Sequence, residues 1–306
     1  FMSAPRPIVP HHDRPVAYLG GVGMAFGIAA GLVTLRWLGG GLPTSWWVAA
    51  ASYLVLGLAD DIMVFRPLVK FALQALVAAL AVTTGVGSSM TGMRLLDAAL
   101  SWLWIVTLVN AFNLTDVCDG LLGSLGVVMF LALAMLASIF LGDAGSHLLG
   151  FLAAAFTLAA IPRSVHAMPM MAACALVVGV PLFETVFVVG VRMRKGIAWW
   201  KGSPDHFSLR LQAAGFTRGR AVLVACGVAA GWTLCAIVIP LLDPTRIASL
   251  LVGVALSAGA AAAFLLRHQV VLQASRPSSS PRILDDPRPV STERIESPHP
   301  RKEFAS

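Results

Sequence analysis

The sequence predicts an all-α fold, a polytopic transmembrane bundle of about eight or nine apolar helices, some of them half-spans. Of the 306 residues, 58% are hydrophobic and 12% are charged, against roughly 25% charged residues in an average soluble domain. The apolar runs are continuous and lack the alternating pattern of membrane β-barrel strands. The positive charges behind the net charge of +7 gather in loops, which indicates membrane topology and argues against binding to nucleic acid.

The apolar runs divide the chain into membrane segments and polar ends. We assign them to residues 15–35, 46–59, 71–86, 95 into the 108–122 stretch, 121–141, 148–161, 167–191, 221–242 and 247–266. The second and the sixth of these runs are shorter than the ~20 residues that a spanning helix needs. We expect a polar cytoplasmic segment at 1–14, a transmembrane domain at 15–266 and a disordered cytoplasmic tail at 267–306. The basic loop at 192–220 is predicted to be cytoplasmic by the positive-inside rule.

The polar stretch LVNAFNLTDVCDGLL at residues 108–122 lies between two apolar runs. It places Asn110, Asn113, Asp116 and Asp119 at intervals of three, which keeps their side chains on one helical face. Two amides and two carboxylates would then project together where a membrane helix meets water. A solvated helix cap is the alternative for the two aspartates, although the macrodipole does not favour a carboxylate at a helix C-terminus.

A second acidic site is the adjacent pair Asp60 and Asp61. Neighbouring carboxylates at a membrane boundary repel unless a cation, a basic side chain or a shared proton relieves the field. Mg²⁺ is typically held by one or two carboxylates together with substrate phosphates, and Arg66 and Lys70 are near enough in sequence to contact such phosphates. A solvated pair at a helix end is an equally weighted alternative.

Three further polar residues are ambiguous when each is taken alone. Asp143, within LGDAGS at 141–146, is typical of a turn, and His206, within SPDHFSLRL at 203–211, is typical of a loop histidine. Glu184 lies inside an apolar run, where a charge is costly. Either a functional role or pairing with another helix would account for it.

Together and in this order, the motifs resemble the polyprenyl-phosphate N-acetylhexosamine-1-phosphate transferase family, glycosyltransferase family 4, which includes the bacterial undecaprenyl-phosphate N-acetylglucosamine-1-phosphate transferases. HDRPVAYLGG at 12–21 resembles the first cytoplasmic loop of that family. GLADD at 57–61, with Pro67, Lys70 and Gln74, is similar to its aspartate pair. NAFNLTDVCDG at 110–120 is similar to its most specific motif. LGDAGS and SPDHFSLRL are similar to its later aspartate site and its histidine loop.

The resemblance implies a multi-pass enzyme of the inner (plasma) membrane with a cytoplasmic active site. It would move an N-acetylhexosamine-1-phosphate from a UDP-amino-sugar to polyprenyl phosphate, release UMP and begin a cell-envelope glycan, such as that of the cell wall or lipopolysaccharide. The implied cofactor is Mg²⁺, with Mn²⁺ as the alternative. The implied roles are catalysis by Asp60 and Asp61, nucleotide binding by Asn113, Asp116 and Asp119, phosphate binding by Lys70, His206 and Arg14, and metal binding by Asp143 and Asp119.

Two choices stay open on the function. The histidine loop lacks the triple histidine of the muramyl-pentapeptide branch, which favours a donor of the N-acetylglucosamine type. The alternative function is a non-catalytic, deletion-bearing relative that binds lipid phosphate. A homodimer is a candidate assembly.

The membrane side of Asp143 is the main open question about topology. At ~1.5 Å per residue, run 121–141 is long enough to cross a bilayer once, which would put Asp143 on the opposite side from Asp119. An odd number of crossings would then separate Asp119 from the basic loop, although both are expected on the cytoplasmic side. A half-span at 148–161 restores the count but leaves Asp143 outside the site. Folding of run 121–141 back on itself keeps Asp143 in the site, and an internal deletion would leave an inactive relative.

Overall fold

The computed structural model describes residues 43–117, 142–161 and 167–268, with a few further positions in 2–37 and 121–125 and at 270. The helices are α2 (Thr44–Met63), α3 (Pro67–Thr83), α4 (Arg94–Thr115), α6 (Gly142–Ala160), α7 (Ala167–Val177), α8 (Gly179–Arg194), α9 (Phe207–Ala213), α10 (Arg218–Val238) and α11 (Pro244–Arg267), with a 3₁₀ turn η2 (Ile239–Leu241). Two short strands, β1 (Met2–Ser3) and β2 (Val16–Ala17), pair in antiparallel fashion.

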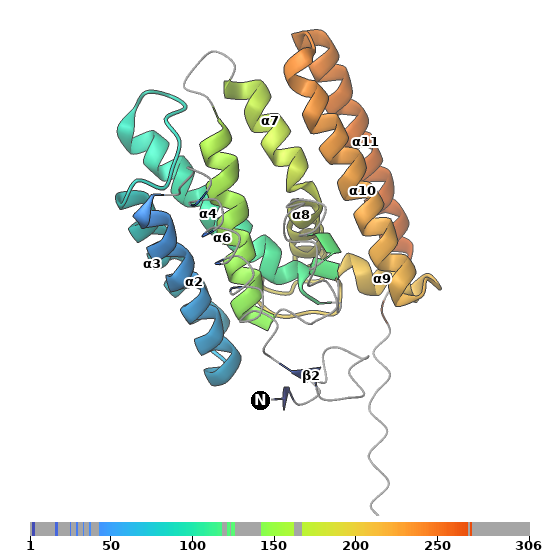
Figure 1. The fold of residues 1–306 in the computed structure, drawn as a ribbon. Coiled ribbons are helices and arrows are strands. Elements are labelled where there is room, and N and C mark those ends of the chain that lie inside the picture. The colour runs from blue at the N-terminus through green and yellow to red at the C-terminus, as the bar shows by residue number, and fades with distance from the viewer. Residues whose placement is uncertain are drawn as a thin grey trace, which may run out of the picture. The chain divides into compact units, whose positions relative to one another are not determined.

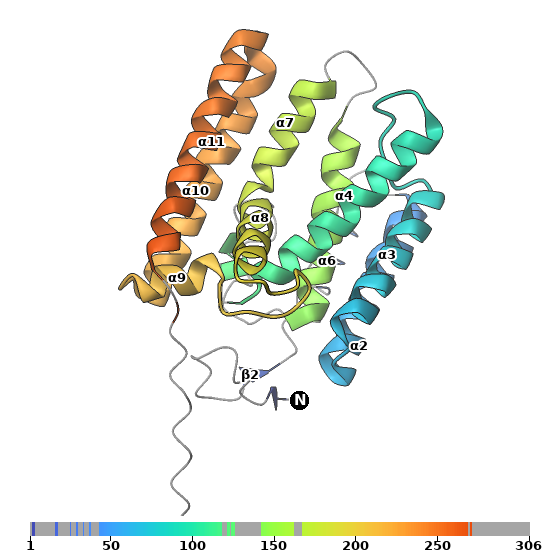
Figure 2. The ribbon, with the colours of Figure 1, turned by 180° about the vertical axis from the view of Figure 1, so that it is seen from behind.

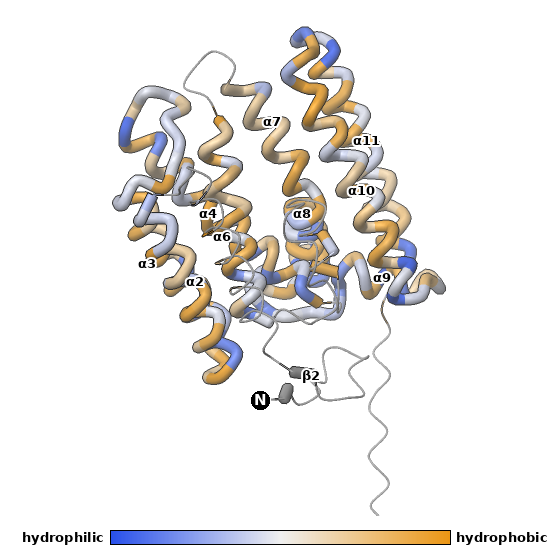
Figure 3. The backbone as a smooth tube through the Cα atoms, in the orientation of Figure 1, coloured by the Kyte–Doolittle hydropathy of each residue, from blue (hydrophilic) through white to orange (hydrophobic). Residues whose placement is uncertain are grey.

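Membrane-spanning helices make up most of the described chain. Five helices are long and apolar enough to cross a membrane, namely α2, α4, α6, α10 together with η2, and α11. The number rises to six if α7 and α8, which meet at a bend of 75°, form one broken span. Apolar residues follow the lengths of these helices, and hydrophilic residues gather near their ends (Figure 3). The predicted polytopic helical fold is confirmed, while predicted runs 15–35 and 121–141 lie largely outside the described residues.

The structure corrects three of the predicted segments. Run 46–59 belongs to α2, which has 20 residues and is long enough to span. Run 148–161 is the main part of α6, which begins at Gly142 and has 19 residues, so the half-span assignment is wrong. Run 167–191 was expected to be continuous, but the helix breaks at Val178 between α7 and α8.

Helix α6 is the central element of the bundle, with α2 and α4 packed against it (Figure 1). In an 18-residue apolar stretch of α6, 78% of the residues are buried, against 6% in the corresponding stretch of α11. Helix α11 lies beside α10 at the margin of the bundle (Figure 2). Glycines permit the close approach: a Cβ on Gly150 would lie 2.6 Å from Val109 Cα. Small residues at such contacts are the usual means by which membrane helices pack closely.

Candidate functional site

The ends of α2, α3, α4 and α6 meet at a cluster of polar side chains. Asp60 and Asp61 lie in the last turn of α2, and Lys70 lies in the first turn of α3. Asn113 lies in the last turn of α4, and Asp143 lies in the first turn of α6. Residues far apart in sequence are therefore brought to one place, which we call the aspartate cluster, with Asp116 as a further member at the C-terminal cap of α4.

Lys70 bridges two carboxylates of the aspartate cluster. Its Nζ lies 2.7 Å from Asp60 Oδ2 and 3.0 Å from Asp143 Oδ1. The Phe65 backbone N–H donates to the other Asp60 oxygen at 2.7 Å. The Asn113 amide donates to Asp143 Oδ1 and, at 3.0 Å, to Ser146 Oγ. Asp60 and Asp143 are thus held by donors from two different helices and one loop.

Asp61 accepts hydrogen bonds from the start of α6. Its Oδ1 accepts from Asp143 N at 2.9 Å, and its Oδ2 accepts from Ala144 N at 3.1 Å. The first N–H groups of a helix have no partner within the helix, and a carboxylate is favoured there by the macrodipole. Asp61 therefore joins α2 to α6 and orients the helix that carries Asp143.

Negative charge is in excess in this cluster. Burial raises the pKa of Asp116 well above its ordinary value, and the nearby charges of Asp143 and Asp61 raise it further, while Lys70 acts in the opposite direction. Lys70 is the cation that the described contacts place among these carboxylates. Relief of the remaining repulsion requires a bound cation or protonation.

The carboxylates of the aspartate cluster suit a Mg²⁺ ion that is shared with substrate phosphates. Among the described residues, no three His, Cys, Asp or Glu side chains are grouped as a metal site. A closed protein cage is therefore not formed by that part of the chain. The carboxylate oxygens do fit the common arrangement in which one or two protein carboxylates and several phosphate oxygens hold the ion.

Asp143 lies on the same side as Asp60, Asp61 and Asp116. Its contacts with Asp61, Lys70 and Asn113 place it at the same end of the bundle as these residues. From Asp143, helix α6 leads away from this end of the bundle, and an even number of crossings up to the basic loop follows if the bent α7–α8 pair is one broken span. Asp119 and Arg14 lie outside the described residues, so their predicted roles stay predictions.

His206 is buried and paired with Glu184. The distance from His206 Nδ1 to Glu184 Oε1 is 2.7 Å, and the Phe207 N–H donates to Glu184 Oε2 at 3.1 Å. Of the two explanations left open for Glu184, the structure therefore supports pairing, here with the histidine loop. His206 is held by this pair at the start of α9, and its predicted phosphate contact stays a prediction.

The neighbouring Asp205 anchors the same loop. It accepts from Lys195 Nζ at 2.7 Å and from the buried Arg210 at 2.6 Å. Burial alone would raise the pKa of Asp205, but these two partners outweigh it and hold the pKa below its ordinary value. Arg210 also donates to the carbonyls of Leu265 and His268, so the loop is tied to the end of α11.

The basic loop also packs next to the aspartate cluster through an aromatic contact. The Trp199 ring lies edge-on to Phe71, with ring centroids 5.6 Å apart, and Phe71 directly follows Lys70 in α3. Arg192 holds this part of the loop by donating to Trp199 O at 2.9 Å and to Ser203 Oγ at 3.0 Å. The histidine loop and the aspartate cluster therefore belong to the same end of the bundle.

Sequence reasoning assigned no role to three residues that the structure makes prominent: Gln74, His147 and Arg210. Gln74 and His147 are fully buried and contact one another. Their positions four residues after Lys70 and Asp143 were a usable signal, since residues four apart share a helix face. Arg210 gave no such signal, because its partners lie in distant segments.

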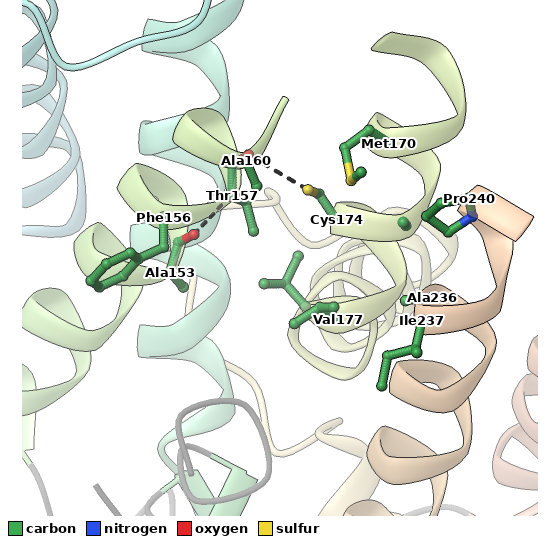
Figure 4. Close-up of a pocket in the computed structure, with 12 residues that line it drawn as sticks. Ala153, Phe156, Thr157, Ala160, Met170, Cys174, Val177, Ala236, Ile237 and Pro240 are labelled. Atoms are coloured by element: carbon green, nitrogen blue, oxygen red, sulfur yellow. Dashed lines mark hydrogen bonds between the residues drawn. The ribbon is translucent and has the colours of Figure 1, made fainter. Parts of the chain in front are cut away.

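A separate apolar cavity of about 450 Å³ lies between α6, α7 and α10 (Figure 4). Ala153, Phe156 and Thr157 line it from α6, with Met170 and Cys174 from α7, and Ile237 from α10. The lining residues that the structure describes carry no charge. This cavity lacks the polar groups of the aspartate cluster, and we assign it no part in the chemistry.

Fold and site together define a class: a polytopic helical membrane protein with a lysine-bridged aspartate centre at the ends of its helices. The model of the family described as "Glycosyl transferase family 4" matches residues 43–138, which include Asp60, Asp61, Lys70 and Asn113. Over this segment the chain matches glycosyl transferase family 4, the family that its motifs resemble.

Similar proteins share most of this length. The chain is 28% identical over 252 residues to a probable undecaprenyl-phosphate N-acetylglucosaminyl 1-phosphate transferase of Bacillus subtilis, covering 70% of each chain. It is 29% identical over 281 residues to a decaprenyl-phosphate N-acetylglucosaminephosphotransferase of Mycobacterium tuberculosis, covering 70% of this chain and 69% of the relative. A shorter match of 151 residues, 30% identical, joins it to an undecaprenyl-phosphate α-N-acetylglucosaminyl 1-phosphate transferase of Yersinia pestis, covering 38% and 41%.

Proposed function

We propose that this protein transfers N-acetylglucosamine-1-phosphate, or a closely related N-acetylhexosamine phosphate, from a UDP-sugar to a polyprenyl phosphate. The convergence of Asp60, Asp61, Lys70, Asn113 and Asp143 at one end of the bundle carries this proposal. The names of the similar proteins add the lipid acceptor and the sugar.

The reaction asks for positioning and charge neutralisation more than for covalent chemistry. An oxygen of the lipid phosphate forms a bond to the sugar-linked phosphorus of the donor. The bond from that phosphorus to the bridging oxygen of the diphosphate breaks, and UMP leaves with the bonding electrons. The product is a polyprenyl diphosphate sugar that would begin a cell-envelope glycan.

Lys70 is suited to bind a phosphate oxygen, because its positive charge is held by Asp60 and Asp143 at the end of the bundle where the other site residues lie. Asp60 would accept a hydrogen bond or a proton from the lipid phosphate, while Asp61 keeps α6 in place. Asn113 and Asp116 lie at the end of α4, where the amide and the carboxylate would contact the nucleotide.

A magnesium ion fits the excess of carboxylates in the aspartate cluster. Asp143 and Asp116 would hold it together with phosphate oxygens, and it would supply charge neutralisation of the diphosphate. The predicted contribution of Asp119 lies outside the described residues. Mn²⁺, which takes similar ligands, is the alternative ion.

We place the site on the cytoplasmic face of the plasma membrane, or inner membrane. The end of the bundle with the aspartate cluster has an excess of basic side chains: Arg66, Arg194, Lys195, Lys201, Arg218 and Arg220. At the opposite end, Arg94 is close in sequence to Asp97 and Arg246 pairs with Asp243. The positive-inside rule assigns the basic end to the cytoplasm, where UDP-sugars are made.

The non-catalytic alternative is not favoured. It rested on the short distance in sequence between Asp119 and Asp143, which suggested an internal deletion that would leave an inactive relative. The contacts of Asp143 with Lys70, Asn113 and Asp61 support an assembled site instead.

Release of UMP by the purified full chain tests the proposal. The protein in detergent is given undecaprenyl phosphate, Mg²⁺ and one donor: UDP-N-acetylglucosamine, UDP-N-acetylgalactosamine or UDP-N-acetylmuramoyl-pentapeptide. We expect UMP and a lipid-linked product with the first donor, and loss of both after Asp60→Asn or addition of EDTA.

The matched control is Asp243→Asn, which changes an exposed aspartate at the opposite end of the bundle and keeps a side chain able to cap α11. It should retain wild-type activity. Folded wild-type protein that forms no lipid-linked product from any of the three donors would refute the proposed function.

A further inference from the structure

A second polar contact between α3 and α6 lies one helical turn behind the contact of Lys70 with Asp143. Gln74 follows Lys70 by one turn of α3, and His147 follows Asp143 by one turn of α6. Gln74 Nε2 lies 2.7 Å from His147 Nε2. The two helices are therefore joined by two successive side-chain contacts, a half-buried ionic one and a fully buried neutral one.

Both members of the inner contact are fully buried. Because the Gln74 amide nitrogen can only donate, His147 Nε2 accepts and the imidazole proton is on Nδ1. Gln74 Oε1 and His147 Nδ1 are then buried without a partner. Reversal of the amide exchanges donor and acceptor but still leaves one of each unpaired.

Such an arrangement is unfavourable for simple packing. An apolar pair of similar size would fill the same space without burying unpaired polar atoms. A buried hydrogen bond does have a directional preference, and in a medium of low dielectric constant it is strong. It can therefore hold two helices in one register where apolar side chains would tolerate several.

The surroundings keep this contact rigid. The Tyr53 hydroxyl from α2 donates to Gln74 O at 2.9 Å, and the Tyr53 ring stacks on Phe151 of α6 with centroids 5.3 Å apart. Tyr53 and Phe151 are themselves fully buried. The inner contact is thus fixed by α2, α3 and α6 together, the same helices that carry Asp60, Lys70 and Asp143.

We propose that Gln74 and His147 are positioning residues, which set the distance and orientation of Lys70 relative to Asp143. Lysine is long and flexible, so its own ion pairs do not hold α3 in register. The short, buried Gln74–His147 hydrogen bond does so, one turn away. The catalytic consequence of this inference rests on the proposed function. The expected effect on the position of Lys70 does not depend on that function.

The kinetic test compares His147→Leu, which removes the hydrogen bond, with His147→Gln, which keeps an acceptor near the position of Nε2. We expect His147→Leu to lower kcat for UMP release at least about tenfold, since small misplacements of reacting groups are costly. KM for both substrates should change less than about threefold. The unfolding temperature should fall somewhat, because the buried Gln74 amide loses its partner, and Gln74→Met with His147→Leu should restore it without restoring kcat. His147→Gln should recover most of kcat.

Coupling between the two residues gives a second readout. Gln74→Met with His147→Leu should lose no more activity than either single variant, because both remove the same interaction. Wild-type kcat in His147→Leu, additive losses in the double variant, or activity that falls only in step with stability would overturn the proposal.

Labelling of Lys70 keeps the inference testable even if the proposed function fails. The rate at which an amine-reactive ester acylates Lys70 is measured by mass spectrometry in the folded full chain. We expect a rise of at least about threefold in His147→Leu and little change in His147→Gln. Lys195, which pairs with Asp205 away from this contact, is the internal control. An unchanged Lys70 rate in His147→Leu refutes the positioning role whether or not the wild-type protein makes UMP.

Discussion

Replacement of Gly57 by alanine should disrupt the aspartate cluster by pushing α6, which carries Asp143, away from α2. Gly57 faces the start of α6, and a Cβ at this position would meet the backbone of Asp143 and Ala144, with Ala144 N at 2.6 Å. Contacting heavy atoms prefer about 3.5–4.0 Å. Helices α2 and α6 would therefore have to separate by about 1 Å, because backbone atoms cannot move aside as a flexible side chain can.

Two opposing free-energy changes set the effect on stability. An overpacked contact costs about 1–3 kcal/mol, and the hydrogen bonds from Asp143 N and Ala144 N to Asp61 would weaken as well. The gain in helix propensity from glycine to alanine is about 1 kcal/mol. We expect a net loss of about 1–2 kcal/mol. The loss of activity should be larger, about 100-fold, since a displacement of about 1 Å at a reacting group has that order of effect.

The assay measures UMP release and the thermal unfolding of Gly57→Ala beside Gly253→Ala. Gly253 lies within α11, and a Cβ there would meet no atom within 4 Å, so this control gains the same propensity without a clash. It should keep full activity and equal or higher stability. Wild-type activity and stability in Gly57→Ala would show that α2 and α6 do not pack as closely as described, and the placement of Asp143 beside Asp61 would have to be abandoned.

Three further predictions concern other contacts of the site. Asp61→Asn should lower the unfolding temperature less than Asp61→Leu does, because asparagine keeps one of the two acceptor oxygens and leucine keeps neither, a difference of about 1 kcal/mol; equal unfolding temperatures in the two variants would contradict the capping role. Arg210→Met should destabilise by about 3–5 kcal/mol in chemical denaturation, since it leaves Asp205 buried with one partner fewer, while the exposed Arg246→Met should have little effect. Because the folded-state pKa of Asp205 is lowered, its ionised form stabilises the protein above the unfolded pKa of about 3.9, and that stability is lost as pH falls through the folded pKa. Asp205→Asn should therefore be less stable than wild type at pH 7, with the difference shrinking in acid unfolding measurements below pH 4; a constant difference would refute it.

The membrane character and the core of the site were both predictable from the sequence. Continuous apolar runs report burial in lipid directly, since each residue contributes independently of its neighbours in space. The three-residue spacing of Asn113 and Asp116 and the adjacency of Asp60 and Asp61 are local patterns as well. Helix ends were less predictable, because apolar run 46–59 omits polar residues that the helix nevertheless includes.

The position of Asp143 shows why the remaining part of the site was not predictable. Counting crossings from apolar run lengths left its membrane side open, and the run that bears on it, 121–141, lies largely outside the described residues. Gly142 adopts a left-handed φ of 66°, and a Cβ there would lie 2.9 Å from the Asp61 carboxylate. Glycine thus lets the chain enter α6 directly against Asp61, an arrangement between distant residues that no local pattern encodes.

The sequence by itself determined a helical membrane protein, its resemblance to a family and the residue types of the aspartate cluster, because hydropathy, spacing and motif order are properties of neighbouring residues. Only the tertiary structure decided that Asp143 lies beside Lys70, that Glu184 pairs with His206, and that Gln74 meets His147. Each of these contacts joins segments far apart in the chain, and its free energy depends on how helices pack and which polar groups find partners.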